Sequence, residues 1–283
     1  MNEKGLQVLE QYDIRLQRSF GGRGSLMLET DQGLKLLKEF AGSQTKLPCE
    51  QALLERLEER RVCGVDRIVP NRSGNLVSIG DYDTPYILKN WPPGRECDPR
   101  NEEELQRSMR TLARIHREAR GVWQLGEEEK RKCAGTERLR ELEKHNRELK
   151  RAQSFIRNRH KKGSFELLFL QCAEAVFRDG RLALEKLEAS GCGELYERAL
   201  REEHVCHGEY IHHNILISRQ ETAVVNFQHF EINVQVNDIC LFLRKIMEKQ
   251  NWNGRLAARM LEAYERELAL SEQERFYLAV SLY

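Results

Sequence analysis

The stretch that decides the fold is His207-Gly208-Glu209-Tyr210-Ile211-His212-His213-Asn214-Ile215-Leu216-Ile217. Its polar first half leads directly into aliphatic residues, a pattern typical of a loop that ends in a short strand. Two short strands are predicted here, at residues 214–217 and 223–227, and together they form a β-hairpin. The loop therefore carries one carboxylate, Glu209, and one amide, Asn214, beside a compact hairpin.

Toward the N-terminus, the first ninety residues predict a small antiparallel sheet that carries one helix. The helix is expected at residues 48–60, where leucines recur at helical spacing. The glycine-rich residues 21–25 predict a flexible turn between two strands. The predicted strands are residues 13–20, 26–30, 33–40, 76–79 and 85–89.

Beyond residue 90 the pattern becomes helical. The adjacent Pro92 and Pro93 stop the sheet, because proline cannot serve a central strand. An amphipathic helix is predicted at residues 102–119, and residues 136–160 and 164–189 predict a long antiparallel helical hairpin that turns near Lys162-Gly163. We therefore expect an α+β protein of two lobes, a β-rich lobe at residues 1–90 and a helical lobe at residues 91–283, with the loop segment at residues 204–230.

The composition of the chain limits which partners and compartments are expected for the protein. The 283 residues include 46 basic and 45 acidic ones, so no global field favours nucleic acid. No apolar stretch is long enough to span a bilayer, and the N-terminus lacks the apolar core of a secretory signal. The eight cysteines form no Cys-x-x-Cys pair, which favours reduced thiols in a cytosol.

The loop resembles that of the aminoglycoside phosphotransferase-like kinases, which read His-Gly-Asp, four residues, Asn, and then a strand ending in Asp. The resemblance implies a protein-kinase-like fold that binds ATP and Mg2+. It makes Glu209 and Asn214 the catalytic residues, and Asn214 and Asn226 the metal-binding ones. It also implies that Lys38 contacts phosphate with Glu50 as its partner, and that Gly22, Gly24 and Ser25 cover the phosphates.

Simpler interpretations stay open at several of these positions. Residues 21–25 are equally typical of an ordinary hairpin turn, and Lys38 and Glu50 of surface charges. A metal site is the weakest alternative for the nearby histidines, since no cysteine or acid completes a ligand set. Those histidines are His204, His207, His212, His213 and His229.

The sequence departs from the active pattern at the positions that matter most for chemistry. Glu209 stands where active kinases carry Asp, and its longer side chain displaces the carboxylate. Asn226 stands where a metal-binding Asp is expected, and Gln228 where relatives often place a second acid. A neutral amide brings no negative charge to a cation that prefers anionic oxygen.

A narrower resemblance is to the CotS-like spore coat proteins, whose members usually continue past the equivalent of Tyr283. It implies a protein made in the mother-cell cytoplasm that associates with the spore coat, with coat proteins and a small-molecule or nucleotide ligand as partners. The segments that carry it are Gly22-Arg23-Gly24-Ser25, residues 29–40, 86–91, 94–98, 112–116, 206–217 and 226–252.

Two functions follow. In the first, the chain is a pseudokinase that serves as a coat-assembly or ligand-binding module. In the second, it is an ATP-dependent phosphotransferase that acts on a small hydroxyl compound or a coat component, with Glu209 as the base. The amide at Asn226 favours the first, because lost metal charge weakens stabilisation of the transition state.

Overall fold

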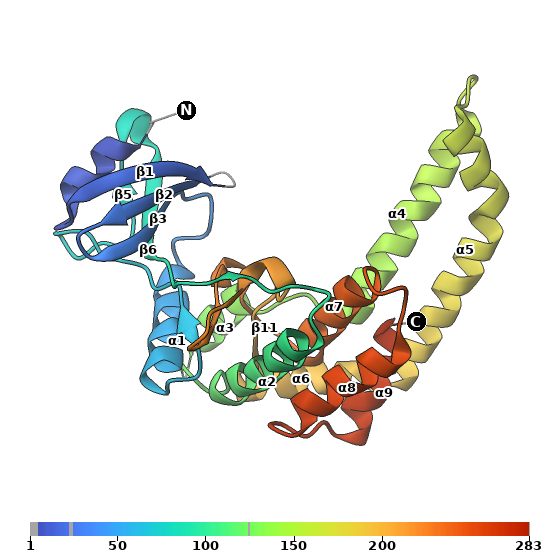
Figure 1. Cartoon of the computed structure of the whole chain (residues 1–283). Coiled ribbons are helices and arrows are strands. Elements are labelled where there is room, and N and C mark those ends of the chain that lie inside the picture. Colours follow the sequence, from blue (N-terminus) through green and yellow to red (C-terminus); the bar gives the residue numbers. More distant parts are fainter. Residues whose placement is uncertain (1–4, 23–24, 124, 283) are drawn as a thin grey trace.

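The computed structural model describes residues 5–22, 25–123 and 125–282, and it has two lobes, as expected (Figure 1). The N-terminal lobe is a five-stranded antiparallel sheet in the order β1-β2-β3-β6-β5. The helix α1 (Leu47–Glu59) lies between this sheet and the rest of the molecule. The strands are β1 (Leu16–Gly22), β2 (Ser25–Thr30), β3 (Gly33–Glu39), β6 (Pro85–Asn90) and β5 (Ser78–Ile79).

One face of this sheet is closed by a segment that the sequence did not predict. The 3-10 helix η1 (Leu6–Gln11) buries Val8 and Leu9 against Leu28, Leu37 and Leu88. The opposite face carries Leu36 and Lys38, since alternate residues of a strand point to opposite sides. The sheet therefore presents a partly polar face toward the C-terminal lobe.

The C-terminal lobe contains eight helices among the described residues and a second sheet in the order β4-β10-β9-β7. The sheet's strands are β4 (Gly64–Val65), β10 (Thr222–Val224), β9 (Ile215–Ile217) and β7 (Arg95–Glu96). β8 (Val205–Cys206) pairs with β11 (Glu231–Ile232). The helices are α2 (Glu102–Glu118), α3 (Glu127–Cys133), α4 (Arg138–Asn158), α5 (Ser164–Ala189), α6 (Cys192–Glu202), α7 (Val236–Met247), α8 (Gly254–Glu265) and α9 (Glu272–Leu282).

The helix α2 forms the centre of this lobe. Asn101 caps it by accepting hydrogen bonds from the backbone N–H groups of Glu103 and Glu104, which satisfies two donors that the first turn leaves free. Its apolar stripe, including Leu105 and Leu112, is buried in the largest core cluster. The buried stripe of α2 packs in the same core cluster as residues of the short strands and so supports them.

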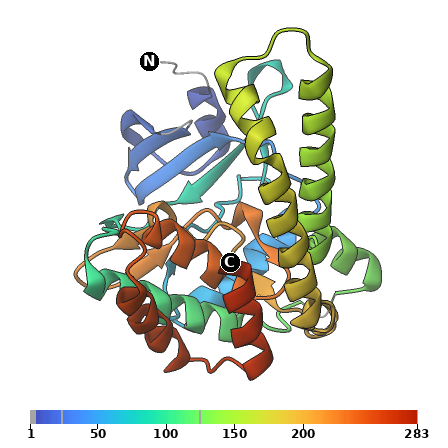
Figure 2. The same cartoon turned by 90° about the vertical axis from the view of Figure 1, so that its right-hand side faces the viewer.

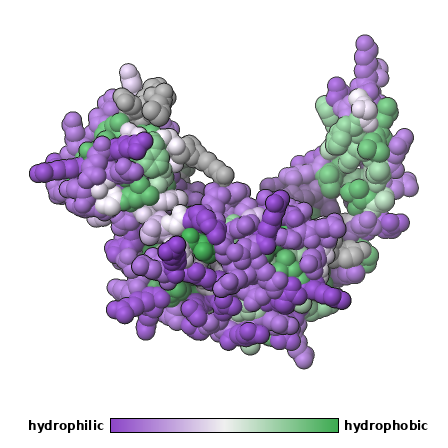
Figure 3. All heavy atoms as spheres, viewed as in Figure 1, coloured by the Kyte–Doolittle hydropathy of each residue, from purple (hydrophilic) through white to green (hydrophobic). Residues whose placement is uncertain are grey.

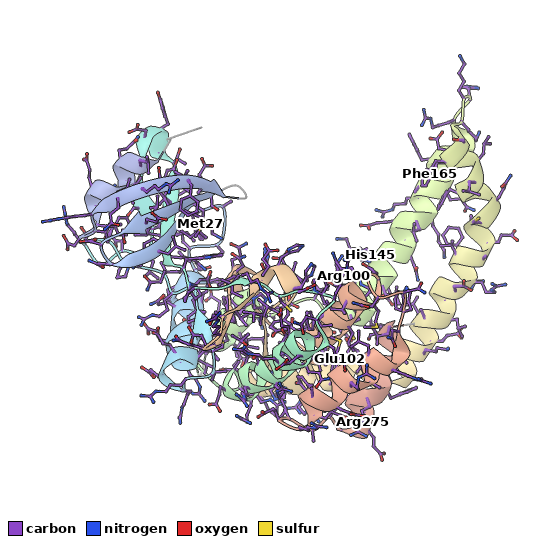
Figure 4. The ribbon with its side chains drawn as sticks, viewed as in Figure 1. Met27, Arg100, Glu102, His145, Phe165 and Arg275 are labelled. Atoms are coloured by element: carbon purple, nitrogen blue, oxygen red, sulfur yellow. The ribbon has the colours of Figure 1, made fainter. Side chains whose placement is uncertain are left out.

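The predicted helical hairpin is present as α4 and α5, which project from the lobe (Figures 1 and 2). Ile156 is the buried residue of α4, and Ala173 and Leu187 are those of α5. Apolar side chains such as Phe165, 76% exposed, stay on its surface (Figures 3 and 4). No described helix combines the length and the apolar character that crossing a membrane would require.

One sequence expectation needs correction, and several elements were not predicted. The strand predicted at residues 223–227 ends at Val224, because Asn226 adopts a left-handed conformation (φ 68°) that leaves the strand. The helices α3 and α6 and the two-residue strands β4, β7, β8 and β11 were not predicted. A strand of two residues is too short to show a periodic pattern in the sequence. In addition, β4 pairs with β10, which lies far from it along the chain. The domain division at residue 90 stays a prediction.

Candidate functional site

A cleft of about 750 Å3 lies between the N-terminal sheet and the loop that follows β8. Its apolar wall includes Met27, Leu36 and Trp91, from β2, β3 and the segment after β6. Figure 4 labels Met27, which lies on the sheet above the C-terminal lobe. Its polar wall includes three predicted site residues, Lys38, Asn214 and Asn226. Residues far apart in the sequence thus meet in one cavity.

The start of the loop is held by Asp238, a fully buried residue in the first turn of α7. Its carboxylate accepts the backbone N–H groups of His207 at 2.7 Å and Gly208 at 2.9 Å. It also lies 3.0 Å from Nε2 of His116. Burial alone would raise the pKa of Asp238, but its hydrogen bond and charge interaction with His116 hold that pKa below its usual value. An ionised carboxylate therefore anchors the loop.

His207 is neutral in this arrangement. Its Nδ1 accepts the backbone N–H of Glu209 at 3.1 Å, so its other nitrogen, Nε2, carries the proton and donates to the Val225 carbonyl at 3.0 Å. Burial lowers the pKa of His207, with Asp238 opposing that effect. His207 therefore ties the loop to the segment after β10 and has a structural role.

Gly208 is required where it stands. Its φ is 81°, in the left-handed region, and a Cβ built on it would lie 2.0 Å from the carbonyl oxygen of His229. Any side chain there would push the loop away from residue 229. The backbone of Gly208 thus allows the loop to pass close to residue 229, whereas Glu209 does not line the cleft.

The loop's functional side chains form a chain of amides. Asn214 donates from Nδ2 to the Glu209 carbonyl at 2.9 Å, and Asn226 donates from Nδ2 to Oδ1 of Asn214 at 2.9 Å. The Glu209 carboxylate, with its side chain 43% exposed, lies 3.7 Å from Nε2 of His229. The two amides that the sequence proposes as metal ligands are therefore in direct contact, with Asn226 donating and Asn214 accepting.

Lys38 reaches the cleft but does not pair with Glu50 as expected. Its ammonium donates to Oε1 of Gln228. Burial lowers the pKa of Lys38, and the nearby charge of Lys89 adds to this, while the carboxylates of Asp66 and Glu50 oppose it. Lys38 thus lies within the field of Glu50 but has an amide as its contact.

The partner of Glu50 is Lys89, which sequence reasoning missed. The Lys89 ammonium, fully buried, lies 2.7 Å from Oε1 of Glu50 and 3.0 Å from Oδ2 of Asp66. Burial would lower the pKa of Lys89, but the carboxylates of Asp66 and Glu50 raise it. Lysine inside a strand that is otherwise apolar was the available signal, since a buried lysine needs a paired acid.

Asp66 also links this buried cluster to the cleft. Its Oδ2 accepts the backbone N–H of Asn226 at 3.0 Å. Its Oδ1 is buried without a hydrogen-bond partner among the described residues. The cluster of Glu50, Asp66 and Lys89 therefore holds the left-handed turn at Asn226 in place.

The remaining predicted positions differ in outcome. Ser25 lines the cleft and pairs with Gly22 in the hairpin of β1 and β2, whereas Gly24 lies outside the described residues. Phe227 packs in the core with its ring 4.5 Å from that of His207, so it does not fill the cleft. No group of three or more His, Cys, Asp or Glu residues suited to a metal occurs among the described residues.

The donors in the cleft suit a nucleotide better than a magnesium ion. Lys38 offers a cation for phosphate, and the apolar wall can enclose a base. At the predicted metal position the groups are the amides of Asn214 and Asn226, and Oδ1 of Asn214 is already engaged. Magnesium requires an octahedral oxygen set and is usually bound through carboxylates, so these residues fit it poorly.

Comparison with known proteins gives the family. A family model described as "Phosphotransferase enzyme family" matches residues 26–277, while no curated protein matches significantly. Among solved structures, an aminoglycoside phosphotransferase from Alicyclobacillus acidocaldarius superposes with a TM-score of 0.81 at 18% identity, covering 98% of this chain and 82% of that one.

Two further solved structures show the same fold. A spectinomycin phosphotransferase, solved with ADP and spectinomycin, has a TM-score of 0.64 at 11% identity over 96% of this chain and 82% of its own. An amicoumacin kinase, solved with AMP-PNP and Ca2+, has a TM-score of 0.61 at 16% identity over 97% and 81%. With a family model that spans most of its length, the chain belongs to the phosphotransferase enzyme family.

Proposed function

We propose that this protein binds a nucleoside triphosphate in the cleft without depending on magnesium, and that phosphoryl transfer by it is slow or absent. The observation that carries this proposal is the contact between Asn214 and Asn226, two neutral amides at the predicted metal position. The first half of the proposal rests on the open cleft and on Lys38 inside it.

Each wall of the cleft has a part in such binding. Met27, Leu36 and Trp91 offer apolar surface for a base, which favours a planar ligand. Lys38 has no ion-paired carboxylate among the described residues, because Lys89 engages Glu50. Its positive charge is therefore available to a phosphate group once Gln228 moves aside.

Transfer is disfavoured because charge neutralisation is lacking. Phosphoryl transfer proceeds almost entirely by positioning and by stabilising the charge that builds up on the phosphoryl oxygens. An amide at position 226 supplies no anion to hold a metal there, so this contribution is lost. Binding without turnover fits a pseudokinase that senses or carries a ligand.

The experiment restores the missing acid. The double variant Asn226→Asp and Glu209→Asp is assayed for the rate of phosphate release from ATP with magnesium. We expect this rate to exceed that of the wild type by at least about tenfold, because the restored carboxylates hold the metal and place the base. A tenfold change in rate corresponds to about 1.4 kcal/mol in the activation free energy. The matched control is Glu209→Asp alone, which leaves the metal position neutral. Wild-type turnover equal to that of the double variant would contradict the proposal.

One observation favours a second function, transfer to a small hydroxyl compound. The Glu209 carboxylate is partly exposed in the cleft region beside His229, where it could accept a proton from a bound hydroxyl. Two similar structures are named as a spectinomycin phosphotransferase and an amicoumacin kinase. Wild-type release of ADP that requires an added hydroxyl acceptor, yields the phosphorylated acceptor and is lost in Glu209→Gln would establish this function instead.

The spore coat role rests on the CotS-like sequence segments alone. We propose coat association as the cellular setting, with coat proteins as partners and the mother-cell cytoplasm as the place of synthesis. A fluorescent fusion followed through sporulation in an endospore-forming host tests it. Fluorescence that stays dispersed after coat assembly would contradict this setting.

A further inference from the structure

A second cavity, of about 680 Å3, shares Trp91 with the cleft. Pro92 and Pro93 line it, so it borders the segment that leads from β6 toward α2. Thr222 of β10 lines it as well, opposite the helix. The cavity therefore adjoins the connection between the two lobes but is distinct from the cleft.

Four arginines line this cavity. Arg107, Arg110 and Arg114 are spaced by three and four residues along α2, so they share one face of the helix. Arg61, from the turn after α1, joins them. Four guanidinium groups that converge on one concave surface create a field that attracts anions.

The acids of the cavity do not cancel this charge. Glu58 and Glu221 are the acids that line it, and the Glu58 carboxylate already accepts a hydrogen bond from Arg67 at 2.7 Å. On the basic side, Arg114 is paired with Glu267 at 2.6 Å. Arg110 also interacts with the charge of Glu267 and Arg107 with that of Glu104, but neither acid lines the cavity.

Two guanidinium groups are left for a ligand. Within the described residues, the guanidinium groups of Arg61 and Arg110 make no hydrogen bond and no ion pair within 4 Å, and the Arg107 guanidinium donates at 3.2 Å to the backbone carbonyl of Ser218. Arginines on an ordinary solvated helix face point into open solvent, whereas these arginines line a cavity. The excess of unpaired positive charge thus sits in a space large enough for an organic molecule.

A buried hydroxyl gives independent support. Thr222 is 6% exposed, and its Oγ1 is buried with no hydrogen-bond partner among the described residues. Buried polar atoms are almost always satisfied, so an orphaned one that lines a cavity indicates a missing polar group. Thr222 lines the cavity while its Oγ1 lies beneath the surface, so a ligand oxygen reaches this hydroxyl when the lining shifts locally.

We propose that this cavity binds a phosphorylated small molecule. The planar guanidinium fork matches the oxygens of phosphate in a bidentate way, and arginine is the side chain best suited to it. Trp91 and the two prolines provide apolar contact for the organic part. This site is independent of the nucleotide proposed for the cleft, because Lys38, Asn214 and Asn226 do not line it.

The test is calorimetric titration of the full chain with inorganic pyrophosphate, the simplest probe of the proposed group. The double variant Arg107→Gln and Arg110→Gln is expected to weaken binding by at least about tenfold, because each charge-assisted hydrogen bond contributes strongly to affinity. The titrations are repeated in the Lys38→Met background, so that pyrophosphate bound in the cleft does not contribute to the signal. Arg117→Gln, an exposed arginine of the same helix that does not line the cavity, controls for the general loss of positive charge.

A second variant keeps the test informative if the double variant is poorly folded. Thr222→Val keeps the shape of the side chain but removes the hydroxyl, and it is expected to weaken pyrophosphate binding while retaining the wild-type unfolding midpoint. Binding weaker than about 1 mM in the wild type would overturn the proposal. So would binding that Lys38→Met abolishes, or that the arginine variants and Thr222→Val leave unchanged.

Discussion

At the scale of single residues, the buried cation Lys89 is the group on which the N-terminal lobe depends most. Its removal leaves Glu50 and Asp66 as buried carboxylates without a counter-charge. Lys89→Met is therefore expected to lower the free energy of unfolding by about 3–5 kcal/mol, measured by urea denaturation. Lys35→Met is the matched control, since Lys35 contacts the Gln32 carbonyl and the Asn90 amide oxygen. Equal losses in the two variants would contradict this account of Lys89.

The pH dependence of stability also belongs to single residues. Burial lowers the pKa of His207. At mildly acidic pH the unfolded chain therefore binds a proton at this histidine, whereas the folded chain does not. Stability from this group is present above its ordinary pKa, about 6.5, and is lost as the pH falls below that value, by at most about 1.4 kcal/mol per pH unit. His207→Gln is expected to flatten this loss between neutral and mildly acidic pH in denaturation curves.

Other histidines provide the controls for that measurement. Burial also lowers the pKa of His204, so His204→Gln should remove a separate share of the same loss. His145 is exposed on α4, and His145→Gln is the control for replacing an exposed histidine. A profile that is identical in the wild type and in His207→Gln would show that His207 is not buried in its neutral form.

Residue types predicted the fold better than they predicted contacts. The loop from His207 to Asn214 identified the architecture, because its spacing and the following hairpin are local features. The partner of Glu50 was assigned wrongly, since Lys38 and Lys89 lie on neighbouring strands and both face the same side of the sheet. Which lysine meets Glu50 depends on side-chain packing between β3, β6 and α1, which a strand pattern does not encode.

At the scale of elements, the loop after β8 is constrained by glycine and by its anchor on α7. Gly208→Ala combines a left-handed φ with a Cβ only 2.0 Å from the His229 carbonyl oxygen. We expect it to cost more than about 2 kcal/mol in unfolding free energy, near the upper part of the range for strained backbone. Gly33→Ala, with φ 90° but open space around the Cβ, should cost about 1 kcal/mol. A smaller loss for Gly208→Ala than for Gly33→Ala would contradict the close approach.

The helical hairpin of α4 and α5 should be the least stable pair of helices. It buries few side chains, whereas α2 and α7 are embedded in the main core cluster. Hydrogen–deuterium exchange should therefore be fastest around the turn at residues 159–163 and slowest in α2 and α7. Protection of the turn equal to that of α2 would indicate a contact that covers the hairpin.

The elements that sequence reasoning missed share one property. β4, β7, β8 and β11 are two residues long and are stabilised by pairing with distant segments. The long amphipathic helices, in contrast, were predicted because their apolar stripe repeats over several turns. The anchor at Asp238 was likewise not predicted, since its role depends on contacts with His116 and the loop backbone.

At the scale of the whole molecule, two lobes bring Lys38 and the paired amides of Asn214 and Asn226 to one cleft. The chain belongs to the phosphotransferase enzyme family and shares its fold with structures named as a spectinomycin phosphotransferase and an amicoumacin kinase. The departure lies in the charge at the metal position. The central claim is therefore that nucleotide binding persists while its usual dependence on magnesium is lost.

The most direct measurement is calorimetric titration of the wild type with ATP, in EDTA and in excess magnesium, beside Lys38→Met. The account predicts that affinities in the two conditions agree within about threefold, less than 1 kcal/mol, and that Lys38→Met weakens both by at least about tenfold. Binding that appears only with magnesium, or that Lys38→Met leaves intact, would contradict it.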